Sequence, residues 1–88
     1  MKLQKGLILR YVDGMPIVVP LGEVAKTFNG MIRLNESGAL LWKRLADGAD
    51  RAALVEVLLD TYAVTEAEAE ADVESFLAPL LEAGFLEA

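Results

Sequence analysis

The segment GMIRLNESGALLW, residues 30–42, joins a short extended stretch directly to a helix. Asn35 ends the extended stretch and is a favoured helix cap, because its side-chain oxygen can accept a backbone N–H from the first turn. Glu36 follows, and a negative charge is stabilising at that end of a helix. Gly48 supplies the stop, since glycine readily adopts the conformation that ends a helix. The predicted helix has one apolar face, made of Leu40, Leu41, Trp42 and Leu45.

The residues before this segment predict a β-hairpin. Leu7–Val12 is rich in strand-forming residues, and Pro16–Pro20 contains two valines and an isoleucine. The Asp13-Gly14 pair between them is the two-residue signal of a tight turn. Gly22 to Lys26 then predicts a wider connection to the next strand.

The third strand has two predicted starting points. Phe28 to Leu34 supplies a strand over its whole range. Asn29-Gly30 is also a turn signal, however, and a turn there shortens the strand to Met31–Leu34. Both alternatives place a strand directly before the Asn35 cap.

Two further helices are predicted after Gly48. The first opens near Asp50, and its apolar residues recur at three- and four-residue steps: Leu54, Val55, Leu58, Leu59 and Tyr62. Thr65 and Glu68 form a capping box that starts the last helix. The apolar stripe of that helix consists of Val73, Phe76, Leu77, Leu80 and Leu81. Pro79 either kinks this helix or marks its last regular turn, and Phe85-Leu86 folds back onto the body after Gly84.

This order of elements defines an α+β domain, with a three-stranded antiparallel sheet followed by three helices in a winged-helix-like arrangement. The chain has 88 residues, of which 55% are hydrophobic and 25% charged, and this balance is typical of one globular domain over residues 1–88. The longest apolar stretches, such as Met15–Leu21, are far shorter than the roughly 20 residues of a membrane-spanning helix. The N-terminus shows no signal-peptide organisation, so the expected location is the cytoplasm.

The chain contains no cysteine and no histidine. Thiolate chemistry and the commonest transition-metal ligand are therefore missing, together with the one side chain that ordinarily titrates near neutral pH. We predict no catalytic residue, no metal site and no cofactor. The composition favours a binding protein over an enzyme.

Charge is divided unevenly along the chain. Residues 1–51 hold all eight Lys and Arg against five acids, whereas residues 52–88 hold nine acids and no base. The last helix carries six of those acids: Glu66, Glu68, Glu70, Asp72, Glu74 and Glu82. Helical neighbours two positions apart point to different sides, so these acids predict a solvated face and not a metal site. Phosphates would repel such a helix, which argues against nucleic acid as a partner.

Residues 30–42 resemble the signature of the PqqD-like family, the peptide chaperones also called recognition elements of ribosomally made peptide natural products (RiPP recognition elements). Val18-Val19-Pro20, Tyr62-Ala63-Val64, Phe76-Leu77 and Gly84-Phe85-Leu86 agree with the same pattern across essentially the whole chain. The resemblance implies a three-stranded sheet packed on three helices. It also implies a function, which is to bind the leader segment of a precursor peptide as an added strand. The bound leader is then presented to a modifying enzyme, often of the radical S-adenosylmethionine type, in pyrroloquinoline quinone biosynthesis or another peptide pathway.

The resemblance also implies where the peptide binds. The peptide would pair with the third strand and lie against the last helix, at Asn29, Met31, Ile32, Arg33, Leu34, Ala69, Asp72, Val73 and Phe76. An exposed strand edge offers unpaired N–H and C=O groups to an extended peptide, and a neighbouring apolar helix accepts its side chains. Lys26, Arg33 and Asp72 either set the direction of the peptide or serve solubility alone.

Two other functions remain open at this level. The order of the helices also fits a winged-helix regulator, although the acidic last helix argues against DNA binding. A structural subunit that forms a homodimer through the open strand edge is the other alternative, because small sheets with bare edges tend to pair.

Overall fold

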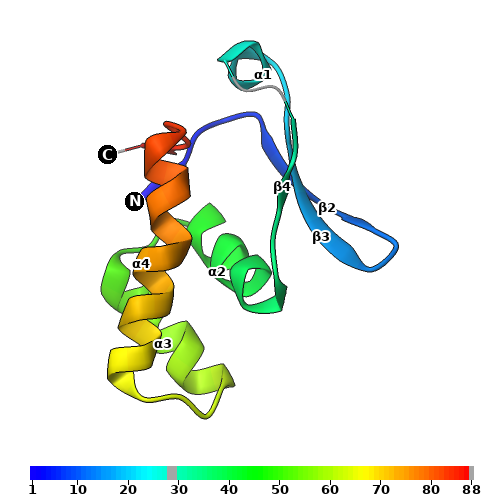
Figure 1. Ribbon diagram of the computed structural model, residues 1–88. Coiled ribbons are helices and arrows are strands. Elements are labelled where there is room, and N and C mark those ends of the chain that lie inside the picture. Colours follow the sequence, from blue (N-terminus) through cyan, green and yellow to red (C-terminus); the bar gives the residue numbers. More distant parts are fainter. Residues whose placement is uncertain (28–29, 88) are drawn as a thin grey trace.

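The fold is a small sheet covered on one face by three helices, as the order of elements predicts (Figure 1). The structure is a computed structural model that describes residues 1–27 and 30–87. Its elements are β1 (Lys2–Leu3), β2 (Leu7–Val12), β3 (Met15–Pro20), α1 (Glu23–Thr27), β4 (Ile32–Arg33), α2 (Glu36–Ala46), α3 (Arg51–Thr61), α4 (Glu66–Glu82) and β5 (Leu86–Glu87). Strands β2, β3 and β4 form an antiparallel sheet in that order, which confirms the α+β prediction.

The predicted hairpin is confirmed. Strands β2 and β3 pair from Leu7 opposite Pro20 to Val12 opposite Met15. Asp13 and Gly14 have φ angles of 52° and 79°, so both turn residues lie in the left-handed region. A two-residue turn of this hand matches the natural twist of the two strands.

Strand β4 is shorter than either predicted alternative, and two prolines explain why. Leu21 donates its N–H to the Gly6 carbonyl at 2.7 Å, so the alternate residues of β3 that face β4 are Pro16, Val18 and Pro20. Proline has no N–H, which leaves Val18 as the only donor that β3 can offer to β4. The ladder is therefore limited to Ile32 and Arg33. Of the predicted third strand, Phe28 and Asn29 lie outside the described residues.

The connection after β3 contains a short helix that the sequence did not predict. Helix α1 begins at Glu23, after Gly22, whose φ of 65° turns the chain out of the strand. Glu23 in its first turn and Lys26 in its last form an ion pair of 3.0 Å. An acid in the first turn and a base in the last turn interact favourably with the helix dipole. Their i,i+3 ion pair adds a small further stabilisation of the helix.

The two chain ends form a second, small sheet. β1 pairs with β5 antiparallel, and the amino group of Met1 donates to the Ala49 carbonyl at 2.9 Å. Phe85, just before β5, is 1% exposed, so the predicted return of the chain after Gly84 is confirmed. The two-residue strands themselves were not predicted.

Helices α2 and α4 begin at their predicted caps, and α3 begins near Asp50 as predicted, with Asp50 itself as the cap. The N–H of Gly38 donates to Asn35 Oδ1 at 2.7 Å, and that of Ala53 donates to Asp50 Oδ1 at 2.8 Å. Thr65 and Glu68 exchange both bonds of the capping box. Each helix thereby satisfies backbone donors that its first turn leaves open.

The core lies between the sheet and these helices. Trp42 is 3% exposed and belongs to it, as its helical spacing predicts. Its fully buried members come from every layer: Val18, Leu41, Leu45, Leu54, Leu58, Val73, Leu77, Leu80 and Phe85. Helix α4 continues through Pro79 and ends one turn later, at Glu82. Nowhere in residues 1–27 and 30–87 is there a helix with both the length and the apolar character that crossing a membrane requires.

The capping box makes a testable contribution to stability at low pH. Backbone and side-chain hydrogen bonds with Thr65 lower the pKa of Glu68 from its ordinary value of 4.5. A carboxylate whose pKa is lower in the folded state stabilises the fold above its unfolded-state pKa and loses that effect as the pH falls through the folded value. We expect Glu68→Gln to melt at a lower temperature than the parent at about pH 7, and this gap to close on acidification below 4.5.

Thermal melts of both proteins across this pH range measure the gap. Glu70→Gln removes an exposed acid of the same helix outside the capping box and is the control for net charge. A gap that stays constant from about pH 7 to about pH 3 would contradict the assignment.

Candidate functional site, a cleft between the sheet edge and the last helix

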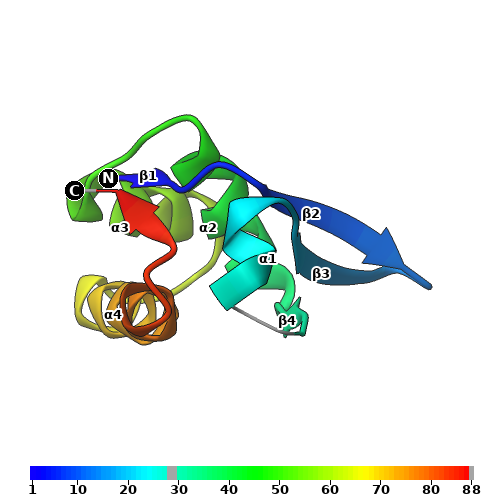
Figure 2. The same cartoon turned by 90° about the horizontal axis from the view of Figure 1, so that it is seen from above.

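A cleft of about 520 Å³ separates β4 from α4. Figure 1 shows the two elements alongside each other, and Figure 2 shows that both lie on the same side of α2. Helix α2 closes the cleft as its floor, contributing Gly38 and Leu41. The volume lies within the usual range of ligand-binding clefts, about 300–1,000 Å³.

One wall is the free edge of β4. Leu34 donates its N–H to the Pro16 carbonyl at 3.0 Å, so the backbone groups of Leu34 and, two residues earlier, Ile32 face β3. The N–H and C=O of Arg33 point the other way, away from β3 and outward from the edge of the sheet. The structure therefore resolves which residues face outward, a point that the sequence left open. Met31 has the same phase as Arg33 and is 65% exposed.

The opposite wall is one face of α4. Its lining residues are spaced three and four apart, as one helical face requires: Asp72, Ser75, Phe76, Pro79 and Leu80. Leu80 is 2% exposed and lies at the base of the wall, whereas Phe76 is half-buried. Asp72, Ser75 and Pro79 are exposed along its rim. The wall thus combines an apolar centre with a carboxylate at its N-terminal end.

Gly38 has no side chain, which leaves space for the helix cap at the floor of the cleft. A Cβ placed on Gly38 would lie 2.9 Å from Asn35 Oδ1, closer than real contacts allow. The same oxygen accepts hydrogen bonds from the Gly38 N–H and from Ser37 Oγ at 3.1 Å. Glycine at position 38 therefore lets the helix cap form directly beneath the cleft.

The structure brings together only part of the site that the family resemblance implied. Ile32, Arg33, Leu34, Asp72 and Phe76 all line the cleft. Ala69 and Val73, in contrast, are 0% and 1% exposed and lie in the core. Their placement on the cleft wall was wrong. Asn29 lies outside the described residues.

Ala69 and Val73 were misplaced because the sequence did not show which stripe of α4 faces the core. Both residues belong to the stripe that continues at Leu77 and Leu80 into the core. The cleft face is the adjacent stripe, which starts at Asp72 and continues at three- and four-residue steps. Ser75 and Pro79 were missed, although their spacing from Asp72 is the signal that could have found them.

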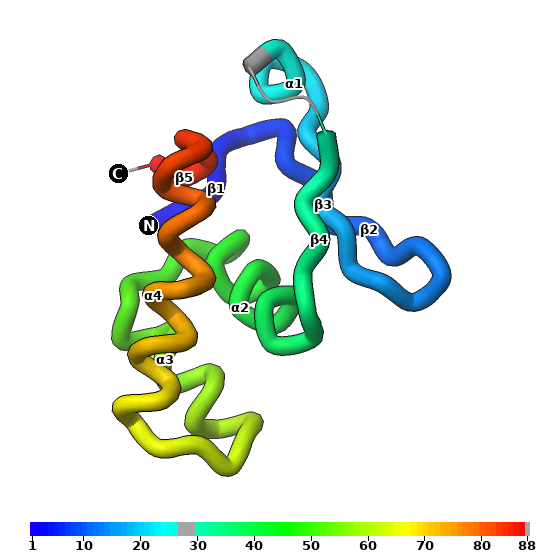
Figure 3. Tube along the Cα trace, viewed as in Figure 1, coloured from blue at the N-terminus to red at the C-terminus, as the bar shows by residue number. Residues whose placement is uncertain are grey.

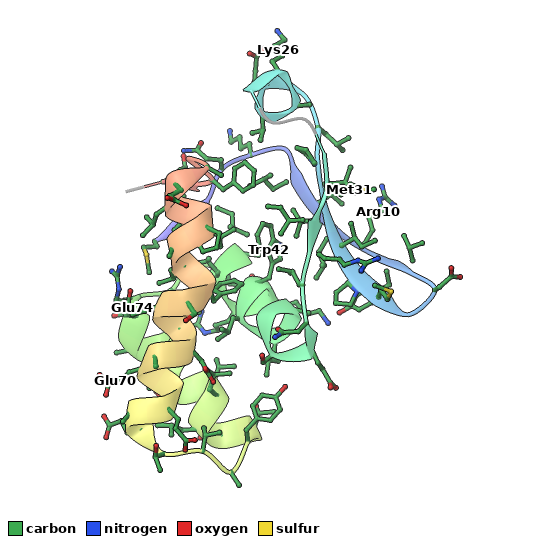
Figure 4. The ribbon with its side chains drawn as sticks, viewed as in Figure 1. Arg10, Lys26, Met31, Trp42, Glu70 and Glu74 are labelled. Atoms are coloured by element: carbon green, nitrogen blue, oxygen red, sulfur yellow. The ribbon has the colours of Figure 1, made fainter. Side chains whose placement is uncertain are left out.

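The acidic run of α4 is a solvated face, as predicted. Its acids are exposed, and Glu74 forms an ion pair with Arg51 of α3. In Figure 4, Glu70 and Glu74 lie on the side of α4 away from β4. In the part of the chain that the structure describes, no group of three potential metal-binding side chains comes together.

This arrangement is that of a small α+β binding domain, with an open sheet edge facing a helix across a cleft. Residues 6–86 match the family model described as Coenzyme PQQ synthesis protein D (PqqD). The match spans nearly the whole chain, so the protein belongs to the PqqD family. A comparison with curated protein sequences found no match.

Two solved structures share the fold over its full extent. TbiB1, in complex with the TbiA(beta) leader peptide, superposes with a TM-score of 0.79 at 22% sequence identity, covering 100% of this chain and 96% of that one. Lasso peptide synthetase B1, complexed with the leader peptide, superposes with a TM-score of 0.76 at 24% identity, covering 99% and 96%. Both likenesses establish the fold.

The positions of Phe76 and Phe85 predict different costs of truncation. Phe85→Ala empties a fully buried site and should destabilise the protein by about 3–5 kcal/mol. Phe76→Ala removes a half-buried ring from the cleft wall, and we expect a clearly smaller loss. Denaturant unfolding of the two variants measures the difference. Equal losses would place Phe76 in the core.

Proposed function

We propose that this protein is a peptide chaperone that binds the leader segment of a ribosomally made precursor peptide. The observation that carries this proposal is the free edge of β4, which faces α4 across the cleft. Membership of the PqqD family supports it, and so do the two similar structures, both of which are complexes with leader peptides.

The peptide binds as a fourth strand beside β4. The N–H and C=O of Arg33 face the cleft and can pair with an extended backbone, with Met31 in the same phase. Alternate peptide side chains then point toward Phe76, Leu41 and the other residues that line the cleft. Main-chain hydrogen bonds to β4 set the register of the peptide, and contacts of its side chains with the cleft lining select among peptide sequences.

The chemistry is carried out by a separate enzyme. The cleft lining offers one carboxylate, from Asp72, together with the hydroxyls of Ser37 and Ser75. The chain has neither histidine nor cysteine to complete a nucleophilic or metal-dependent site. We therefore assign it a non-catalytic role, in which it presents the leader to a peptide-modifying enzyme of the radical S-adenosylmethionine type or another class. Precursor peptides are made on ribosomes, so the encounter takes place in the cytoplasm.

Proline substitutions along β4 test strand addition directly. Arg33→Pro removes an N–H that faces the cleft, where an edge strand tolerates proline, so the fold should survive. A lost bond worth about 0.5–1.5 kcal/mol should weaken peptide binding several-fold to roughly tenfold. Leu34→Pro instead removes the bond to Pro16 and should lower the melting temperature.

Fluorescence anisotropy with a labelled candidate precursor peptide, chosen from short open reading frames near this gene, paired with thermal melts, measures both effects. Tyr11→Pro, whose N–H points outward from the far strand β2 of the same sheet, controls for proline at a strand edge. Peptide affinity that falls only in proportion to lost stability in all variants would exclude β4 as the docking edge. Self-association that competes with the peptide would indicate the homodimer instead.

A further inference from the structure

The spacing of α4 side chains matches the repeat of an extended peptide. Asp72, Phe76 and Leu80 follow one another at four-residue steps on the cleft face, which is about 6 Å per step at 1.5 Å per residue. Alternate residues of a strand are about 6.6 Å apart. A peptide paired with β4 therefore places its successive cleft-facing side chains beside Asp72, Phe76 and Leu80 in turn.

A second hollow adjoins the cleft at the Asp72 end. It measures about 330 Å³, and its lining combines two carboxylates, Glu36 and Asp72, with apolar groups of Leu58, Tyr62 and Val64. Asn35 and Ser37 complete it. Asp72 is the one α4 residue that lines both the cleft and this hollow.

The lining of this hollow fits a long basic side chain. Lysine and arginine have an apolar stem and a cationic head, and they bind best where apolar surface leads to an acid. Leu58, Tyr62 and Val64 provide that surface, and an arginine can also stack on the Tyr62 ring.

Three cationic features stand near the hollow, and none neutralises it. Lys43 of α2 lines a neighbouring hollow with Glu36 and Tyr62, and its Nζ lies over the Tyr11 ring, 5.1 Å from the centroid. Arg33 lines the cleft but not the hollow. The positive end of the α2 dipole is offset by Glu36 in its first turn. Among the ion pairs of the described residues, Arg51 is paired with Glu74 and Lys26 with Glu23, and neither pair involves Asp72.

We propose that this hollow is a subsite for a lysine or arginine of the bound peptide, an inference that rests on the proposed peptide-binding function. The next two cleft-facing residues of the peptide are apolar and contact Phe76 and Leu80. Antiparallel pairing is the more stable arrangement, and a peptide antiparallel to β4 runs in the direction of α4 (Figure 3). The recognised pattern, from N- to C-terminus, is therefore basic, any residue, apolar, any residue, apolar.

Selection from a display library of random peptides, about 12 residues long, tests this pattern without a known ligand. Peptides selected by the parent protein should be enriched in Lys or Arg two residues before a large apolar residue. Asp72→Lys should shift that position to Asp or Glu. Glu70→Lys makes the same charge change on the other side of α4 and should leave the selected pattern unchanged (Figure 4).

A synthetic peptide from the selection then allows a charge-swap experiment. Replacing its basic residue by Glu should weaken binding to the parent roughly 3- to 10-fold, and Asp72→Lys should recover most of this loss. Asp72→Asn gives a second, milder variant, and circular dichroism verifies that each variant folds.

The outcomes separate the two proposals. Selected peptides without a basic preference, or with one that survives Asp72→Lys, overturn the subsite while peptide binding stands. Selection of no peptide by the parent protein, together with no shift of the Arg33 amide resonance on addition of the precursor peptide, overturns the proposed function itself.

Discussion

The position of Val18 between Pro16 and Pro20 is the constraint on which the open edge depends. These three residues present their backbones to β4, and only Val18 has an N–H to give. Strand β4 is consequently held to the sheet over a short stretch, by its pairing at Ile32 and Arg33 and by the Leu34 N–H on the Pro16 carbonyl. The rest of the hydrogen-bonding capacity of β4 faces the cleft, where an incoming strand can use it.

Segment 30–42 builds two sides of that cleft. It supplies β4 as one wall and the start of α2 as the floor, with Asn35 capping the helix between them. The cap fixes where strand ends and helix begins, so the edge and the floor are held in one geometry by a single side chain. Helix α4 then supplies the opposite wall through a stripe adjacent to the one it buries, and the two share Leu80.

Local signals explain which features could be predicted from the sequence. Asp13-Gly14, Asn35, Asp50 and the Thr65–Glu68 box act within a few residues, and each was predicted correctly. β1 and β5 were missed because two-residue strands carry no hydrophobic period. The rotation of α4 about its axis is decided by packing, which is why Ala69 and Val73 were placed on the wrong face. The outward direction of Arg33 became clear only from the register of β3 and β4.

The two prolines also have a consequence for how long a peptide bound as proposed stays on the protein. A ladder confined to a few backbone groups, each worth about 0.5–1.5 kcal/mol net, holds an added strand only weakly. For a peptide bound as proposed, residence time then depends on how well its side chains fit along Phe76 and Leu80. A longer, fully paired edge would retain its guest and would also invite stacking of one copy on the next. In the proposed function, the short edge that the β3 prolines leave favours release of the peptide once it has been presented.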